Sequence, residues 1–414
     1  MKKNKFAFTL LLITIFWNIW FPKAGIKLNG IPITVGNVFF AITFFVWIIN
    51  KIKIGKIKSY KISAILIFEI LYCILKYTII YARIGTIIPS LTFIIPLIIY
   101  PIMFFVAVDM IDSKEKIDKI LKIIIYGFFF LCFYAILQYI IGIDKCDIPG
   151  LTVNLSDYKE MGTLWFMKKA NGTDQANAKI VSTYQNGNLF GINLIFIYPL
   201  VYYYYSKNEK IRTLSLMLFI TCAFLTLSRT CWLGIVLFIF LGVILERKKT
   251  EKAILGKILT VFLCIICLVF VFIYIPSIAN RFLGTDKSDW ISMSGRTEGL
   301  TTVLQTVWSS NSILALFIGP QGIVKYSGLA YEMLPLALFA QVGIIGMVLL
   351  YGFFIKIYFS FNKKDYIQKA IQLSLIIWLI IGCIECGYWL PPTALNIFLI
   401  TGLGLASKNI NKEE

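Results

Sequence analysis

Residues 212–249 read RTLSLMLFITCAFLTLSRTCWLGIVLFIFLGVILERKK, two apolar arms that meet at Ser228, Arg229 and Thr230. Cationic residues flank both arms, and such residues prefer the cytoplasmic side of a membrane. The chain must therefore turn at Arg229 on the opposite, outer side. Each arm has about 16 residues, or roughly 24 Å of helix, which is short for a hydrocarbon layer about 30 Å thick. We expect Arg229 slightly below the outer surface, where it either serves a functional site or snorkels and only ends a helix.

The rest of the chain shares this apolar character. Apolar residues make up 59% of its 414 residues, and the mean hydropathy is +0.81, more than one water-soluble core requires. We expect an all-α membrane protein, a polytopic bundle of about 12 transmembrane helices that forms one integral-membrane domain over residues 1–414. The first segment is interpreted as an uncleaved span, because no small-residue cleavage site follows it. The expected spans are 6–22, 31–50, 62–80, 89–109, 121–143, 187–205, 212–227, 230–246, 258–276, 333–355, 369–386 and 388–406.

The distribution of positive charge predicts the topology of these spans. Roughly two thirds of the 40 Lys and Arg residues fall on the side of the N-terminus, so both termini are expected in the cytoplasm. Anionic headgroups of the phospholipid bilayer are sufficient partners for this charge. The net charge of +19 therefore gives no reason to expect a nucleic acid partner.

Two long connections face outward in this topology, residues 144–186 and residues 277–332. Long connections inside a compact fold are usually functional or disordered, and the tryptophans in both favour order. In the second loop, Ser294 can cap an amphipathic helix that lies along the membrane surface or caps the bundle. Its apolar stripe comprises Leu300, Val303, Leu304, Val307 and Trp308.

Charged residues of the second loop join Arg229 on the outer face. Arg281, Arg296 and Lys325 suit an anionic ligand, and the planar fork of arginine matches phosphate oxygens particularly well. Glu332 begins the next span, where it is either a general base or an ordinary interfacial residue. No metal and no cofactor are expected.

Three ionisable residues fall within the expected spans. Glu69 and Lys76 are seven residues apart on one helix face, which predicts a structural ion pair, while Glu385 has no assigned role. A carboxylate relay in a proton-coupled transporter would have the same composition. A transporter therefore stays open as a hypothesis.

Four motifs occur in one order along residues 180–360. They are Thr183–Asn188 before an apolar span, Leu225–Gly234 around the Ser-Arg turn, Ser294–Glu298 with Gly319–Gly322, and Phe339–Gly346 after the loop. Together they resemble the O-antigen ligase and polymerase superfamily, the Wzy-type integral-membrane glycosyltransferases with a GT-C-like fold. Ligases of this superfamily generally have a histidine before the last of these spans. Glu332 stands there instead, which favours a polymerase.

The resemblance implies polymerisation of O-antigen, capsule or related repeat units in the bacterial cytoplasmic membrane. A glycan would move from an undecaprenyl-diphosphate donor to the non-reducing end of a second lipid-linked repeat at the outer face. Arg229 and Arg296 would stabilise the leaving diphosphate without a metal, and Glu332 would deprotonate the acceptor. Chain-length regulator and flippase proteins are implied as partners. The expected substrate-binding residues are Arg281, Lys325, Asn186, Asn188, Gln321 and Tyr331.

Two alternatives stay open beside the polymerase. One is an O-antigen or other glycan ligase of the same superfamily, which differs in its acceptor. The other is a transporter, or flippase, of lipid-linked oligosaccharide, which would need charged groups through the depth of the bundle.

Overall fold

The computed structural model describes residues 2–28, 31–54, 61–84, 95–161, 179–245, 300–309, 312–320, 333–385 and 393–413. Helices dominate these residues. In the first half they are α1 (Lys2–Trp20), α2 (Val35–Ile54), α3 (Lys61–Ile84), the π-helical turn η2 (Ile95–Ile99), α5 (Ile102–Met110), α6 (Lys114–Ile141), α7 (Ile143–Cys146) and α8 (Leu155–Met161). In the second half they are α10 (Gly187–Tyr204), α11 (Glu209–Leu225), α12 (Arg229–Leu245), α16 (Ile313–Ile318), α17 (Leu334–Ser360), α18 (Tyr366–Gly382) and α19 (Thr393–Glu413).

Four of the described helices are long and apolar enough to cross a membrane. They are Val35–Lys53 in α2, Ile62–Ala82 in α3, Lys114–Ile141 in α6 and Leu334–Ser360 in α17. The chain is thus a mainly helical, membrane-embedded protein. Helices lie in every expected span except 258–276, which is outside the described residues. The total of about 12 crossings stays a prediction.

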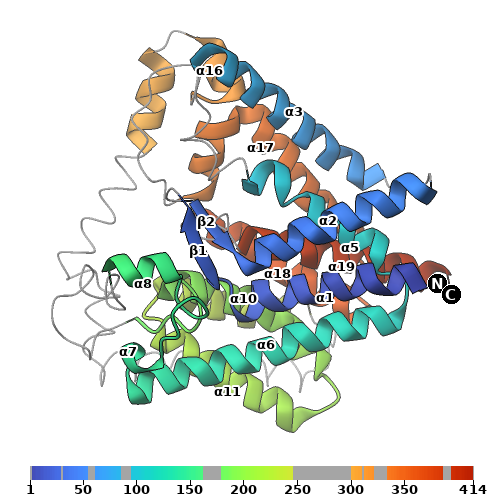
Figure 1. Cartoon of the computed structure of the whole chain (residues 1–414), viewed down its shortest axis with the longest axis vertical. Coiled ribbons are helices and arrows are strands. Elements are labelled where there is room, and N and C mark those ends of the chain that lie inside the picture. The colour runs from blue at the N-terminus through green and yellow to red at the C-terminus, as the bar shows by residue number, and fades with distance from the viewer. Residues whose placement is uncertain are drawn as a thin grey trace.

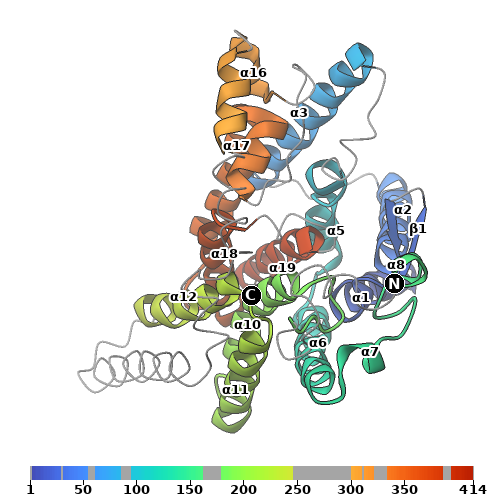
Figure 2. The same ribbon diagram turned by 90° about the vertical axis from the view of Figure 1, so that its left-hand side faces the viewer.

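The helices α1, α2 and α6 lie side by side, and both chain termini are at the right-hand end in Figure 1. We name this end of the bundle the terminal end. The opposite end carries a small β-hairpin together with α7 and α8, and we name it the hairpin end. Figure 2 looks onto the hairpin end and shows α3, α16 and α17 on one flank, with α6, α10 and α11 on the opposite flank.

The most enclosed helix is α10, which packs against α6, α11, α12 and α18. Nearly all of its residues are buried, because it is apolar on every face and offers no polar side to solvent. Tyr198 of this helix stacks on Phe219 of α11, with ring centroids 4.1 Å apart. The core of the bundle therefore surrounds α10, the helix that begins within the Thr183–Asn188 motif.

One element departs from the all-α expectation. The strands β1 (Gly25–Leu28) and β2 (Ile31–Thr34) pair as an antiparallel hairpin, with Gly25 opposite Thr34. The span expected at 31–50 therefore begins as a strand and becomes α2 only at Val35. Hydropathy alone cannot separate the two, because the apolar residues of β2 continue directly into those of the helix.

The hairpin is attached to the first long loop. The backbone N–H of Lys27 donates to the Ser156 hydroxyl at 2.9 Å, and the Lys27 ammonium forms an ion pair with Asp157. Both partners belong to α8. The described part of the loop is thus held against the bundle.

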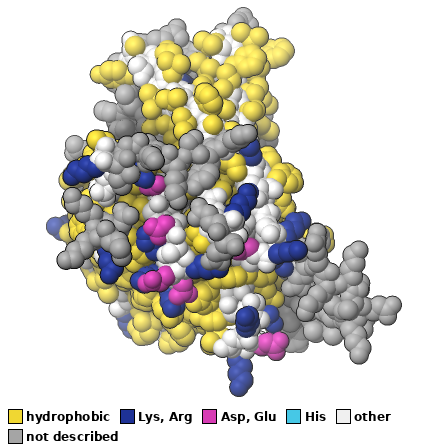
Figure 3. Space-filling model, turned by 90° about the vertical axis from the view of Figure 1, so that its right-hand side faces the viewer, with side chains coloured by type: hydrophobic (Ala, Val, Ile, Leu, Met, Phe, Trp, Pro, Cys, Tyr) yellow, Lys and Arg dark blue, Asp and Glu magenta, His cyan; other side chains and the backbone are white. Residues whose placement is uncertain are grey.

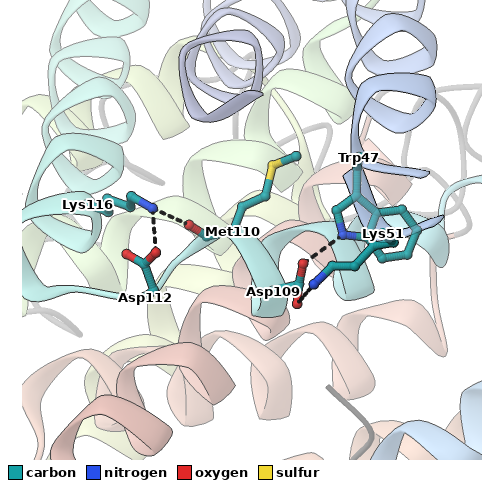
Figure 4. A network of polar contacts seen from close by, with 6 residues as sticks. All are labelled: Trp47, Lys51, Asp109, Met110, Asp112 and Lys116. Carbon is teal, nitrogen blue, oxygen red and sulfur yellow. Dashed lines mark hydrogen bonds and ion pairs between the residues drawn. The ribbon is translucent and has the colours of Figure 1, made fainter. Parts of the chain in front are cut away.

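Positive charge is prominent at the terminal end. Figure 3 faces this end and shows many Lys and Arg side chains with fewer acidic ones. In Figure 4, Asp109 of α5 accepts from the Trp47 indole at 3.0 Å and pairs with Lys51 at 2.5 Å, so that α2 and α5 are joined. The ammonium of Lys116 is likewise paired, with Asp112 at 2.8 Å. These cations are engaged within the protein.

Candidate functional site

Arg229 is the first residue of α12, directly after a tight turn from α11. Leu227 adopts a left-handed backbone conformation with φ 48°, which ends α11. The Ser228 hydroxyl then accepts from the backbone N–H of Cys231 at 3.4 Å and caps α12. The Trp232 indole donates to the Ala223 carbonyl at 3.0 Å across the turn. Arg229 is consequently held at the hairpin end, half-buried.

The segment before α10 packs against this turn. The backbone N–H of Ile180 donates to the Leu225 carbonyl at 3.1 Å. A Cβ placed on Gly187 would lie 2.7 Å from the Thr226 carbonyl oxygen, so only glycine allows this close approach. The first turns of α10 and α12 therefore lie at the same end of the bundle. The positive ends of their helix dipoles lie there with them.

Asn186 and Asn188, both expected to bind substrate, have different surroundings. The side chain of Asn186 accepts from the backbone N–H of Leu189 at 2.8 Å and caps α10. Asn188 is half-buried, and its side chain connects two charged residues. A role in substrate binding stays a prediction for both, but the structure gives Asn186 a local structural role.

Asn188 bridges a cation and an anion. Its amide oxygen accepts from the Lys179 ammonium at 3.1 Å, and its amide nitrogen donates to the Glu385 carboxylate at 3.4 Å. Glu385 lies just beyond the end of α18, which packs against both α10 and α12. The ends of α10, α12 and α18 thus bring two cations, Lys179 and Arg229, to the same region as one carboxylate. These three charged side chains and that of Asn188 are all half-buried.

This geometry revises the placement of Glu385. The sequence puts it inside a span ending at residue 386, whereas α18 ends at Gly382 and Glu385 follows at the hairpin end. Sequence reasoning singled out this residue as an acid in an apolar stretch but gave it no partner. It did not single out Lys179, since a lysine in a long polar loop is unremarkable.

Six of the expected site residues lie outside the described residues. They are Arg281, Arg296, Gln321, Lys325, Tyr331 and Glu332. Of the expected catalytic residues, Arg229 alone is described. The roles expected for the six others stay predictions.

Part of the expected loop helix is described, and residues 300–309 are helical. Val303 of the apolar stripe is buried against Leu336 and Ala340 of α17. Trp308 is 88% exposed, Leu304 55% and Leu300 42%, so the described protein leaves much of the stripe uncovered. Such a half-covered stripe is typical of a helix at a membrane interface.

Two charged groups near β1 have shifted pKa values. Burial lowers the pKa of Lys23 to about 8, although nearby Asp157 and Asp147 oppose the shift. Burial raises the pKa of Asp147 to about 6, against the opposing charge of Lys23. We therefore expect the hairpin end to respond to pH.

No known protein-family model matches the sequence, and a comparison with curated proteins gives no match.

Proposed function

We propose that the chain is a polymerase of polysaccharide repeat units in the bacterial cytoplasmic membrane. The hairpin end would face outward and both termini the cytoplasm, in line with the cation-rich terminal end. The observation that carries the proposal is the half-buried Arg229 at the start of α12, near the Lys179–Asn188–Glu385 bridge. A half-buried guanidinium and a half-buried ammonium beside two helix N-termini suit a diphosphate.

The reaction would transfer a glycan between two lipid carriers. The acceptor hydroxyl oxygen forms a bond to the anomeric carbon of the donor, and the bond from that carbon to the diphosphate oxygen breaks. The leaving diphosphate keeps the electron pair and stays on its undecaprenyl carrier. Arg229, and Arg296 with it, would stabilise the charge that develops there, so the proposed glycosyltransferase needs no metal.

The acceptor hydroxyl must also lose its proton. Glu332 is proposed as the base, as the sequence suggests. The structure adds Glu385 as a second carboxylate at the hairpin end, held by the Asn188 amide. We assign Glu385 a positioning role, in which it orients Asn188 and, through it, Lys179. Arg281, Lys325, Gln321 and Tyr331 are proposed to bind the sugars and the diphosphate.

One observation favours the transporter as a second candidate. Glu69 and Lys76 are buried side chains of α3, a helix long enough to cross the membrane. Ionisable groups at such depth often mark a transport pathway. The glycan ligase differs from the polymerase only in the acceptor, and no described residue favours it.

Vesicles that contain the purified protein and an added lipid-linked repeat unit would test the proposal. The substrate is supplied only on the side that the hairpin end faces, and products are identified by mass spectrometry. Lipid-linked chains of two or more repeats are expected, and vesicles with Arg229→Lys protein serve as the control. Movement of the substrate across the bilayer without elongation would instead establish a transporter. Transfer to a different class of acceptor would establish a ligase.

A further inference from the structure

The membrane-spanning helix α17 is interrupted at Gly343. This residue has φ 61° and ψ −167°, in the left-handed region that glycine tolerates best. A Cβ there would lie 2.3 Å from the Phe317 carbonyl oxygen and 2.4 Å from the Gly319 nitrogen. The end of α16 thus enters the interruption. Gly343 lies nine residues from Leu334, or about 13 Å along the helix, so the break falls inside the membrane-spanning segment.

The helix α3 packs against this break. The Tyr72 hydroxyl donates to the carbonyl oxygen of Val342 at 2.6 Å, which provides a partner for a backbone group next to the break. The ring of Tyr72 also comes within 3.1 Å of a Cβ built on Gly346. In a membrane, irregular backbone is tolerated only where it is buried in protein or lines a hydrated cavity.

Several polar atoms next to this contact have no hydrogen-bond partner among the residues that the structure describes. Cys73 donates to one oxygen of Glu69 at 3.2 Å, but the other carboxylate oxygen has no hydrogen-bond partner. The same is true of the ammonium of Lys76, the hydroxyl of Tyr77, and both polar atoms of the Gln341 amide. The exposed fraction of Glu69 is 0%, of Gln341 1%, of Lys76 3% and of Tyr77 5%.

The expected ion pair between Glu69 and Lys76 does not form. Seven residues along a helix separate two Cα atoms by about 10 Å, and the described structure places no ion pair between these side chains. Both groups instead stay buried without a counterion among the residues described. Polar groups buried without a hydrogen bond are costly, and bound water is the usual way in which proteins offset that cost.

The composition of these groups indicates what binds there. Lys76 donates, Glu69 accepts, and Tyr77 and Gln341 can do both. An anion would satisfy only the donors and a cation only the acceptors, whereas water satisfies both. Ordered waters typically bind buried polar groups that lack protein partners.

We propose that α3 and α17 enclose a hydrated site within the membrane, where water binds Glu69, Lys76, Tyr77 and Gln341 and exchanges their protons. This site is separate from the one at the hairpin end, and it does not depend on glycosyl transfer. Exchange here moves only protons. A proton passing through water from the Lys76 ammonium to the Glu69 carboxylate leaves an amine and a carboxylic acid, with no change in net charge.

The thiol of Cys73 reports directly on this site, because it donates to Glu69. The protein in lipid nanodiscs is transferred to D2O, and infrared spectra follow the conversion of S–H to S–D. Subtracting the spectrum of Cys73→Ala isolates the Cys73 band, and Cys132→Ala isolates that of Cys132. Cys132 is a matched control, since it is also 0% exposed and in the same apolar core, but lies on α6 instead of α3.

The Cys73 thiol should exchange at least about tenfold faster than the Cys132 thiol. The double variant Lys76→Met, Gln341→Leu keeps the volume and removes the polar groups, so it should slow Cys73 exchange about tenfold. Gln138→Leu on α6 is its control and should leave Cys73 exchange unchanged. Equal exchange of the two thiols, or no effect of the double variant, would show that the site is dry and would overturn the proposal.

Discussion

The side-chain amide of Asn188 donates a hydrogen bond to the carboxylate of Glu385, 3.4 Å away and 197 positions later in the chain. The oxygen of the same amide accepts from Lys179 at 3.1 Å. One short polar side chain on α10 therefore fixes a cation and an anion that belong to two other segments. Without the Asn188 side chain, Lys179 and Glu385 would lose the partner that they share.

Replacing Asn188 with Ala should lower polymer formation about tenfold, which corresponds to about 1.4 kcal/mol of transition-state free energy. The reason is that Lys179 and Glu385 are then no longer held in one geometry. The measurement is the rate of chain elongation in vesicles. Asn193→Ala is the matched control, because the Asn193 amide donates to the Leu189 carbonyl of the same helix, at 2.9 Å, and does not bridge two segments in the described part of the chain. Equal losses in the two variants would contradict a specific role for Asn188.

Arg229→Lys should reduce elongation about a hundredfold while the protein still inserts into the membrane, because lysine keeps the charge but loses the bidentate fork. Arg212→Lys at the other end of the same helix pair is the control. Arg212 lies 3.7 Å from Glu209 at the surface, and its replacement should leave elongation unchanged. Normal chain length in the Arg229 variant would remove this residue from the mechanism.

The identity of the general base can be tested with two isosteric variants. Glu332→Gln should abolish turnover with little change in KM, because the acceptor then has no base. Glu385→Gln should retain measurable turnover and raise KM, since a positioning residue acts through Asn188. The pH dependence of kcat for each variant is the second readout. If the two results were exchanged, Glu385 would be the base and Glu332 the positioning residue.

Gly343→Ala should destabilise the protein by about 2 kcal/mol or more, because the new methyl group meets backbone atoms and the left-handed conformation is strained. Gly352→Ala on the same helix is the matched control, with no atom within 4 Å of the added Cβ. There, alanine should be neutral or stabilise by up to about 1 kcal/mol. Thermal unfolding in detergent measures both. An unchanged Tm for Gly343→Ala would indicate a continuous α17.

The stability of the hairpin end should change with pH through Asp147. Burial raises the pKa of Asp147 to about 6, so between its unfolded value near 4 and about 6 the folded state binds more protons than the unfolded state. This contribution to stability is present at acidic pH and disappears as the pH rises through about 6. The Tm of Asp147→Asn minus the Tm of the parent protein should therefore increase as the pH rises from 4 to 7. A constant difference in Tm would contradict the raised pKa.

The amino-acid sequence alone indicated helices in the expected spans and the turn next to Arg229, while the direction of the spans across the membrane stays a prediction. Each of these depends on a window of about 20 residues. The hydropathy of that window and the cations that flank it are local properties of the sequence. The hairpin of β1 and β2 was missed because its apolar strand Ile31–Thr34 runs without a break into α2. Their charge and their place on the expected outer face suggested Arg281, Arg296, Lys325 and Glu332 of the second loop as candidates.

Only the tertiary structure decided which side chains meet. Lipid is as apolar as the helices themselves, so hydropathy carries no information about which helix packs against which. The bridge from Lys179 through Asn188 to Glu385, and the contact between Tyr72 and the break in α17, depend on this lateral arrangement. The shared helix face of Glu69 and Lys76 predicted an ion pair that the fold does not form, because seven residues of helix separate their Cα atoms by about 10 Å.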